Sequence, residues 1–349
     1  MLPLAAFFIS TISKMILVTG GTGFVGAHLL LRLAARQQPI RALYRSNKKL
    51  ATTQQWLSDQ GFSDVKNPIE WVYADLNDIP SLNDALGGVS VIFHTAAHIS
   101  FDPVDEALMR KINIEGTANL VNVALAVGVK QLIHFSSIAA LGSQLHPNWP
   151  ITEENEWDPA LLHSDYAISK YGAEMEVQRG HFEGLITTIL NPGVIVGEGF
   201  YDQSSGSIIK KASKGLYFYT AGSTGWVDIN DVVNLAITMY EQPQNGARFI
   251  VVGANKSYHA FLTALTQQLA VRSPNIGIPY WILKTGALLF ESLAFFGICK
   301  ARINRFTAQS LHSAETYSNQ KVVDTYGISF TPIKETIERV CADFLATKN

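Results

Sequence analysis

Two side chains suited to proton transfer stand four residues apart in the segment YAISK, at Tyr166 and Lys170. Four residues are one helical turn, so both side chains share one face of a helix. A tyrosine hydroxyl beside a lysine ammonium can exchange a proton with a carbonyl oxygen. The pair alone is a weak signal, but Ser136 and Ser137 end a predicted strand, where ligands gather above a parallel sheet.

A glycine-rich turn supplies the second chemical signal. The run ILVTGGTGFVGAHLL passes from an apolar strand through Gly20, Gly23 and Gly26 into an apolar helix. Gly20 permits the tight turn, Gly23 lets a pyrophosphate approach the backbone, and Gly26 lets the helix pack closely on the strand. The free N–H groups of the helix N-terminus then face the phosphate. With strand, turn, helix and next strand in this order, the sequence predicts dinucleotide binding.

The second predicted strand indicates which dinucleotide binds. NAD sites usually place Asp or Glu about twenty residues after the turn, where it accepts from the ribose 2′-hydroxyl. This chain has no acidic residue before Asp59, and the strand ends in Tyr44-Arg45-Ser46 followed by two lysines. Because an arginine there can pair with a 2′-phosphate, we expect NADP, with NAD as the alternative. The competing interpretation is that Arg45 and the lysines only form a solvated loop.

The elements that must position these residues alternate between strands and helices. Strands are expected at 15–20, 39–46, 69–76, 89–97, 129–137, 185–193 and 247–253, and helices at 24–35, 107–127, 164–181 and 230–240. Continuously apolar strands separated by helices predict an α/β fold with a doubly wound parallel sheet of the Rossmann type. Residues 197–228 are predicted to be loops, and the remainder mostly helical.

This pattern predicts three parts. Residues 1–14 form an N-terminal extension, and residues 15–193 plus 230–253 form the dinucleotide-binding domain. Residues 194–229 plus 254–349 form a smaller, mostly helical substrate lobe.

In their order along the chain, the motifs resemble those of an extended short-chain dehydrogenase/reductase of the NAD-dependent epimerase/dehydratase type. The matching segments are TGGTGFVG, ADL (74–76), HTAA (94–97), NIEGT (113–117), FSSIAALG (135–142), YAISK, LNPG (190–193) and WVDINDVV (226–233). They cover about residues 15–240. The segment RALYRS and the lack of sugar-nucleotide motifs make the chain most similar to dihydroflavonol 4-reductase-like and 3β-hydroxysteroid dehydrogenase-like members.

The resemblance implies a role for each matching residue. Tyr166 is the general acid in ketone reduction or the base in alcohol oxidation, and Lys170 binds the nicotinamide ribose and lowers the pKa of the tyrosine. Ser137, rather than the structural Ser136, hydrogen-bonds the carbonyl. The residues implied to contact the cofactor are Gly20, Thr22, Gly23, Phe24, Val25, Gly26, Arg45, Asp75, Leu76, Thr95, Ala96, Ala97, Tyr166, Lys170, Pro192 and Gly193.

Other polar residues have structural interpretations that compete with functional ones. Asn113 supports a network behind Lys170 or only fixes helix geometry. His94 and His98 have no triad or metal-ligand spacing around them, so we expect packed or hydrogen-bonded histidines and no metal. Asp228 and Asp231 are expected to cap the following helix or to anchor the lobe.

Three functions fit these residues. The first is an NADPH-dependent reductase of a ketone or aldehyde, or the reverse alcohol oxidation; steroid-type oxidation with isomerisation is a variant. The second is a nucleotide-sugar epimerase or dehydratase with a retained cofactor, and the third is a non-catalytic cofactor-sensing protein. Candidate lining residues of an apolar substrate site are Phe200, Tyr201, Tyr217, Phe218, Tyr219 and Trp226, whereas Lys210, Lys211 and Lys214 would suit a diphosphate.

The amino-acid composition and net charge limit the kinds of partner that the protein is expected to bind. Of 349 residues, 47% are hydrophobic and the net charge is −2, which gives no electrostatic case for nucleic acid. Two distant cysteines fit a reducing compartment, so we expect a cytoplasmic protein, and the family resemblance allows a homodimer. The first 14 residues make a poor signal peptide. Lys284 and Glu291 interrupt the apolar segment 278–298, which favours a helix of the lobe over a membrane-contacting helix or an oligomer face.

Overall fold

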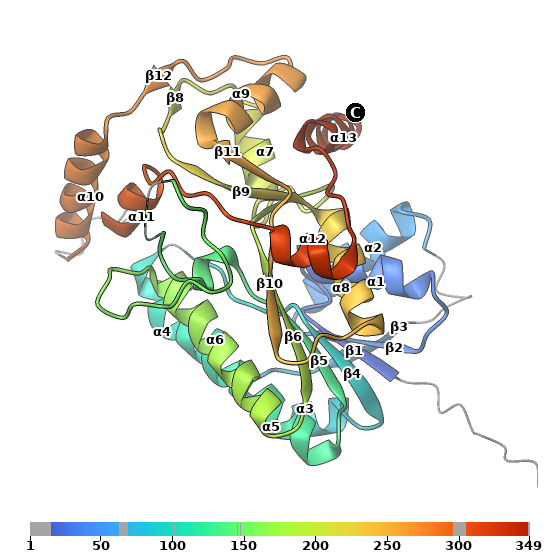
Figure 1. Ribbon diagram of the computed structural model, residues 1–349. Helices are drawn as coiled ribbons and strands as arrows, with labels where there is room; N and C mark the ends of the chain where they lie inside the picture. The colour runs from blue at the N-terminus through green and yellow to red at the C-terminus, as the bar shows by residue number, and fades with distance from the viewer. Residues whose placement is uncertain are drawn as a thin grey trace, which may run out of the picture.

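A sheet of seven parallel strands forms the centre of the protein (Figure 1). The computed structural model describes residues 15–62, 69–100, 102–144, 146, 148–295 and 305–347. The strand order is β10-β6-β5-β4-β1-β2-β3. The strands are β1 (Met15–Thr19), β2 (Ile40–Tyr44), β3 (Ile69–Tyr73), β4 (Val89–His94), β5 (Gln131–Phe135), β6 (Ile186–Pro192) and β10 (Ala247–Val251). The predicted α/β fold is confirmed, and its strand order reverses between β1 and β4, where such folds bind ligands.

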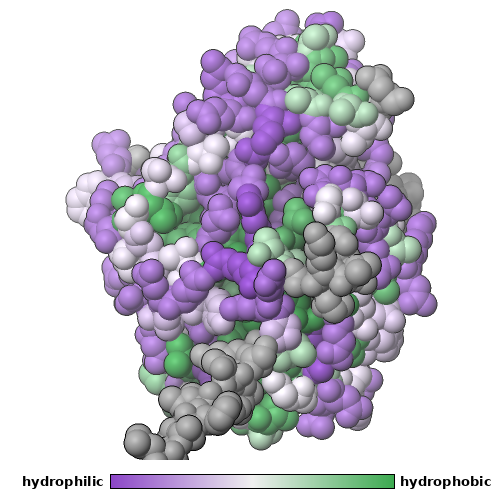
Figure 2. Space-filling model, turned by 90° about the vertical axis from the view of Figure 1, so that its right-hand side faces the viewer, coloured by the Kyte–Doolittle hydropathy of each residue, from purple (hydrophilic) through white to green (hydrophobic). Residues whose placement is uncertain are grey.

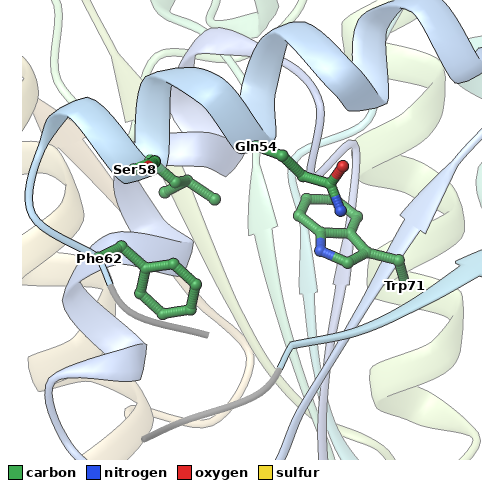
Figure 3. Close-up of a pocket in the computed structure, with 5 residues that line it drawn as sticks. Gln54, Ser58, Phe62 and Trp71 are labelled. Carbon is green, nitrogen blue, oxygen red and sulfur yellow. The ribbon is translucent and has the colours of Figure 1, made fainter. Parts of the chain in front are cut away.

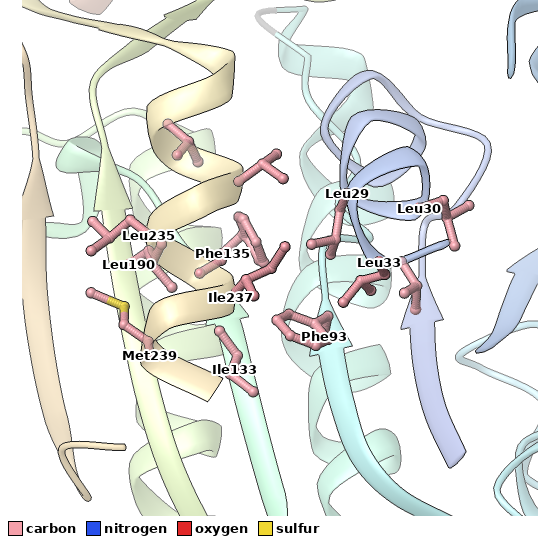
Figure 4. Close-up of a cluster of buried hydrophobic side chains, with 14 of the residues drawn as sticks. Leu29, Leu30, Leu33, Phe93, Ile133, Phe135, Leu190, Leu235, Ile237 and Met239 are labelled. Carbon is pink, nitrogen blue, oxygen red and sulfur yellow. The ribbon is translucent and has the colours of Figure 1, made fainter. Parts of the chain in front are cut away.

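Helices cover both faces of this sheet. On one face, α1 (Phe24–Ala34) and α8 (Ile229–Glu241) pack their apolar sides against β4, β5 and β6 (Figure 4). The buried side chains include Leu29, Leu30, Leu33, Phe93, Ile133, Phe135, Leu190, Leu235, Ile237 and Met239. On the other face, α3 (Ile79–Ala85), α5 (Gly116–Val127) and α6 (Asp165–Phe182) enclose a second apolar cluster. Burial on both sides explains why the strands read as unbroken apolar runs.

The segment predicted as one helix over 107–127 is divided. It comprises α4 (Glu106–Met109), a π-helical turn (Arg110–Glu115) and α5. The extra residue per turn places Asn113 inside the protein, where it is 2% exposed. Apolar periodicity does not reveal such a turn, because the turn spans only six residues.

The region after β2 contains a helix that the sequence analysis did not predict. α2 (Asn47–Asp59) begins after Ser46, whose hydroxyl accepts from the Lys49 N–H at 3.4 Å. A pocket of about 230 Å³ lies between α2 and β3, lined by Gln54, Leu57, Ser58, Phe62 and Trp71 (Figure 3). None of these lining residues belongs to the predicted active site.

A smaller region packs over the carboxyl ends of the strands. Its elements are β7 (Val194–Val196), α7 (Gly206–Ala212), β8 (Phe218–Tyr219), β9 (Ser223–Asp228), β11 (Ala254–Ser257), α9 (Tyr258–Gln268), β12 (Ile276–Gly277), α10 (Tyr280–Phe295), α11 (Arg305–Ser310) and α13 (Ile333–Ala346). α12 (Gln320–Tyr326) packs instead against β10, where Val322 joins the core of the central sheet. The prediction of loops over 197–228 is wrong at α7, β8 and β9. β9 pairs with β7 on one side and with β11 on the other, and its local sequence does not predict these partners. The division of the chain into a dinucleotide-binding domain and a substrate lobe remains a prediction.

Within the described residues, no helix has both the length and the apolar character needed to cross a membrane. Hydrophilic residues cover most of the face shown in Figure 2, and hydrophobic residues form separate patches on it. The N-terminal extension, Cys299 and the end of the apolar segment at 296–298 lie outside the described residues. Cys341 is buried and unpaired.

Candidate active site

The glycine turn is shaped by contacts that leave no room for side chains. Gly20 has a φ of +68°, and a Cβ on it would lie 2.8 Å from the backbone of Ala96. A Cβ on Gly26 would lie 2.2 Å from the Gly20 carbonyl oxygen. The first turn of α1, including Phe24 and Val25, therefore starts directly against the end of β1. Gly23 precedes α1 with no side-chain cap on the helix, so backbone N–H groups are available to a phosphate.

The ends of β1 and β4 are tied together beside this turn. The Thr95 hydroxyl donates to the Thr19 carbonyl oxygen at 2.6 Å, and the Ala96 N–H donates to the Thr19 hydroxyl at 3.3 Å. Ala97 follows and is exposed. The structure therefore brings the segment 95–97 to the same sheet edge as the glycine turn.

The next part of the edge carries Arg45 and Asp75. Arg45 Nη1 lies 3.4 Å from Asp75 Oδ2, and the arginine side chain is 48% exposed. Leu76 is 7% exposed and packs against Gly116, where a Cβ would lie 2.9 Å from the Leu76 Cβ. Thr22, in the glycine turn, accepts from the Thr53 hydroxyl of α2 at 3.4 Å through its carbonyl oxygen. Thr22, Arg45 and Asp75 follow the carboxyl ends of β1, β2 and β3 and form a rim that fits the nucleotide half of a dinucleotide.

The three residues expected to be catalytic meet at the end of β5. Ser137 follows that strand, and its hydroxyl hydrogen-bonds Tyr166 of α6. Lys170 is one turn further along α6, 2% exposed, and its Nζ donates to the Phe135 carbonyl oxygen at 2.7 Å. Ser136 is buried at 7% exposure, whereas Ser137 is partly accessible. The Ser164 hydroxyl caps α6 by accepting from the Ala167 N–H at 2.9 Å, which fixes the start of the helix.

Burial controls the proton chemistry of this group. Loss of solvent raises the pKa of Tyr166, and the hydrogen bond with Ser137 only partly opposes this. The expected lowering of this pKa by Lys170 is not seen in the structure, where the Ser137 hydroxyl is the group that opposes burial. Burial also lowers the pKa of Lys170 to about 8, against the charge of Glu174. Tyr166 is therefore protonated at neutral pH, as a proton donor to a carbonyl must be.

The end of β6 completes the edge. The Gly193 N–H donates to the Val251 carbonyl oxygen at 3.1 Å, and a Cβ on Gly193 would lie 2.4 Å from the Gly225 carbonyl oxygen. Pro192 is buried in the preceding position. The close approach of β6 to β9 thus explains the glycine of the LNPG segment.

Asn113 joins three segments of the site. Its Oδ1 accepts from the His98 N–H at 2.7 Å, and its Nδ2 donates to the His98 carbonyl oxygen and the Ser169 hydroxyl, both at 2.9 Å. It therefore holds the π-helical turn against the residue beside Lys170. Both of its expected roles, support behind the lysine and control of helix geometry, are compatible with these bonds.

The two histidines of HTAAH differ in their surroundings. His94 hydrogen-bonds the hydroxyls of Thr19 at 2.7 Å and Thr117 at 2.9 Å, and burial lowers its pKa to about 3. The prediction of a packed, hydrogen-bonded histidine is confirmed there. His98 lies 3.8 Å from Asp105. Across the described residues, no group of His, Cys, Asp and Glu has the arrangement of a metal site.

The acidic residues of WVDIND anchor the last helix. Asp228 accepts from the Asn230 N–H at 2.8 Å, from the Thr336 hydroxyl at 2.7 Å and from Arg339 Nη2 at 2.6 Å. Asp231 accepts from the Thr331 N–H at 2.8 Å and from its hydroxyl at 2.9 Å. The expectation of capping and anchoring is confirmed.

The aromatic residues proposed to line the substrate site mostly pack elsewhere. Trp226 is 1% exposed and stacks on Phe261 at 3.6 Å, and Tyr201 packs on Phe344 at 4.8 Å. Phe200 lies 5.3 Å from Trp56, beside α1 and α2. The expected wall is wrong for Trp226, a core residue of the smaller region, and for Tyr201, which packs against that core. Of the remaining candidates, Tyr217 and Phe218 are exposed, while Tyr219 stacks on His259 at 3.8 Å.

Comparison with known proteins agrees with this geometry. The profile of the "NAD dependent epimerase/dehydratase family" matches residues 16–253. The chain is 30% identical to "Sterol demethylase protein B" of Methylococcus capsulatus over 303 residues, 86% of this chain and 88% of the relative. It is 24% identical to "3beta-hydroxysteroid-dehydrogenase/decarboxylase isoform 1" of Arabidopsis thaliana, over 94% of this chain and 79% of the relative.

A solved structure extends the likeness to the whole fold. The structure of gox2253 has a TM-score of 0.80 and 29% sequence identity, and covers 96% of this chain and 98% of its own. The chain therefore belongs to the NAD-dependent epimerase/dehydratase family, the extended short-chain dehydrogenases/reductases. A nicotinamide dinucleotide is the cofactor of this family, and the glycine turn, the Arg45–Asp75 rim and the β4 and β6 ends fit it.

Proposed function

We propose that this protein is an NADP(H)-dependent oxidoreductase that interconverts a carbonyl group and an alcohol on an apolar substrate. The observation that carries the proposal is the group Ser137, Tyr166 and Lys170 at the end of β5, in which Lys170 is buried and Tyr166 hydrogen-bonds Ser137 and is protonated at neutral pH. Two relatives are named for sterol or steroid chemistry, which favours an alicyclic alcohol or ketone as the substrate.

Each residue has one task in the proposed reaction. When bound, the nicotinamide supplies the hydride that reaches the carbonyl carbon. Ser137 donates a hydrogen bond to the carbonyl oxygen, and Tyr166 gives that oxygen its proton, so the product is an alcohol. Lys170 binds the nicotinamide ribose and offsets the negative charge that forms on Tyr166. In the oxidative direction the same proton returns to Tyr166.

The preference for NADP is part of the proposal. Arg45 is exposed at the end of β2, and no carboxylate of β2 competes for the ribose. Asp75 holds the guanidinium at the rim from the side of β3. A 2′-phosphate beside Arg45 would gain a charge-assisted hydrogen bond that a 2′-hydroxyl cannot give.

The test is NADPH consumption, with NADH in parallel, on a pooled set of aliphatic, aromatic and steroid ketones, and NADP reduction on the corresponding alcohols. Tyr166→Phe should bind NADPH like the wild type and lose about 10²- to 10⁴-fold in turnover, because it lacks the proton donor. Tyr171→Phe, the next tyrosine of α6, is the matched control and should keep its turnover. Near-normal turnover in Tyr166→Phe would reject this mechanism.

A negative result has a defined meaning. If the protein interconverts sugar nucleotides with no net change in cofactor, the epimerase interpretation replaces the reductase. If it binds NADPH tightly and turns over neither class, the non-catalytic interpretation gains support.

A further inference from the structure

The face of α6 that carries Tyr166 and Lys170 continues to a buried carboxylate. Glu174 lies one turn after Lys170, and the residue is 1% exposed. Removing a carboxylate from water costs several kcal/mol unless partners compensate. The reaction steps described above give this residue no task.

Glu174 is held by groups from three strands or their ends. Asn191 Nδ2, in β6, donates to its Oε1 at 2.5 Å, and Arg248 Nη1, in β10, lies 3.6 Å from its Oε2. Burial raises the pKa of Glu174, while Ser136, Asn191, Arg248 and Lys170 all favour the charged form. The carboxylate therefore ties the catalytic helix to the sheet.

The Asn191 amide also reaches the catalytic serine. Its Nδ2 donates to the Ser137 carbonyl oxygen at 2.9 Å as well as to Glu174. The Ser137 hydroxyl in turn hydrogen-bonds Tyr166. One amide group thus connects the carboxylate of Glu174 with the backbone that positions Ser137.

The charges around Lys170 leave Glu174 as the anion that acts on it. Burial lowers the pKa of Lys170, and Glu174 opposes that shift. His94 of β4 and His134 of β5 also face the lysine, and burial lowers the pKa of both, so both imidazoles are neutral at pH 7. Tyr166 is protonated, and Arg248 lies 3.6 Å from the Glu174 carboxylate.

We propose that Glu174 is a positioning residue of the active site, which keeps the Lys170 ammonium protonated at neutral pH and holds Ser137 through Asn191. The proposal rests on the proposed function for the tasks of Lys170 and Ser137. Its direct consequence, the pH at which Lys170 loses its proton, is a property of the folded chain.

The first readout is NADPH binding, followed by fluorescence between pH 6 and 10. Wild-type binding should weaken as Lys170 loses its proton near its pKa of about 8. Glu174→Gln keeps the shape and removes the charge, so this transition should move down by about one pH unit or more. The control is Glu153→Gln, which removes another buried carboxylate, one that accepts from the Ile250 N–H at 2.7 Å. It should leave the transition in place.

The second readout needs no cofactor and is the free energy of unfolding in denaturant over the same pH range. The ordinary pKa of Lys170 is 10.5 and the folded value is about 8, so the unfolded chain binds more protons between them. Stability from this group is therefore present above the unfolded pKa and is lost as pH falls through the folded pKa. In Glu174→Gln the rise in stability with pH should begin about one unit lower than in the wild type.

The outcomes separate this proposal from the proposed function. If the wild type binds no NADPH, the proposed function fails, and the unfolding series still decides the role of Glu174. If Glu174→Gln does not fold, the double variant Glu174→Gln/Arg248→Met removes both charges of the pair. It should show the same downward shift in the pH of the transition. Curves of Glu174→Gln that superpose on the wild type, or an equal shift in Glu153→Gln, would overturn the proposal.

Discussion

The glycine turn and the anchor of the last helix achieve the same end, a fixed backbone at the sheet edge, by opposite means. Gly20 and Gly26 are six residues apart and act by the absence of side chains, so that β1, α1 and β4 make direct backbone contact. Asp228 and Arg339 are 111 residues apart and act through side chains that meet only in the folded protein. A short sequence motif therefore predicts the local backbone geometry of the turn, whereas no local motif predicts how the smaller region is held to the sheet.

Adding one methyl group to the glycine turn is expected to have the largest effect on stability. Gly26→Ala places a Cβ 2.2 Å from the Gly20 carbonyl oxygen, so the strand and helix must separate. We expect a loss of about 3 kcal/mol or more in the free energy of unfolding, together with loss of NADPH binding.

The matched control is another glycine inside a helix. Among the described residues, no atom lies within 4 Å of the position that a Cβ on Gly286 of α10 would take, so Gly286→Ala should be neutral or stabilising by about 0.5–1 kcal/mol. If both variants unfold alike in denaturant, the close approach at Gly26 does not explain the turn.

Loss of the contact between Asp228 and Arg339 should lower the free energy of unfolding by less than Gly26→Ala does. Arg339→Met leaves the buried Asp228 carboxylate with Thr336 and the Asn230 N–H but without its cation. Because the arginine side chain is 38% exposed, we expect a loss near the lower end of the usual range for a charged hydrogen bond, about 1.5–3 kcal/mol.

An exposed ion pair on α13 provides the control for Arg339→Met. Lys334 lies 3.8 Å from Glu338 and is 86% exposed. Lys334→Met should change stability by less than about 0.5 kcal/mol. Equal effects of the two substitutions in thermal or denaturant unfolding would show that Arg339 contributes no more than a surface charge.

The smallest effect is expected at the rim. Arg45→Met should weaken NADPH binding by about tenfold and leave NADH binding nearly unchanged, because only NADPH presents a 2′-phosphate to the guanidinium. Lys48→Met, in the exposed first turn of α2, is the control. Equal weakening of both cofactors by Arg45→Met would contradict the proposed preference for NADP.

Sequence reasoning predicted the central sheet because its strands are mostly apolar and, apart from β6 and β10, each is followed by a helix. It also located Ser137, Tyr166 and Lys170, which the fold places together at the end of β5. It missed β9 because that strand, STGWVD, is stabilised by β7 and β11 rather than by its own composition. It assigned Trp226 and Tyr201 to a substrate wall because an aromatic side chain looks the same in sequence whether it faces a ligand or a core.

The contact between Asp228 and Arg339 also determines when during synthesis the smaller region can complete its folding. At synthesis rates of about 5–20 residues per second, Arg339 leaves the ribosome on the order of ten seconds after Asp228. During that interval the sheet and the glycine turn can form while the carboxylate of Asp228 still lacks two of its three partners, Thr336 and Arg339. The nascent chain thus exposes the apolar residues that α13 covers until that helix has been synthesised.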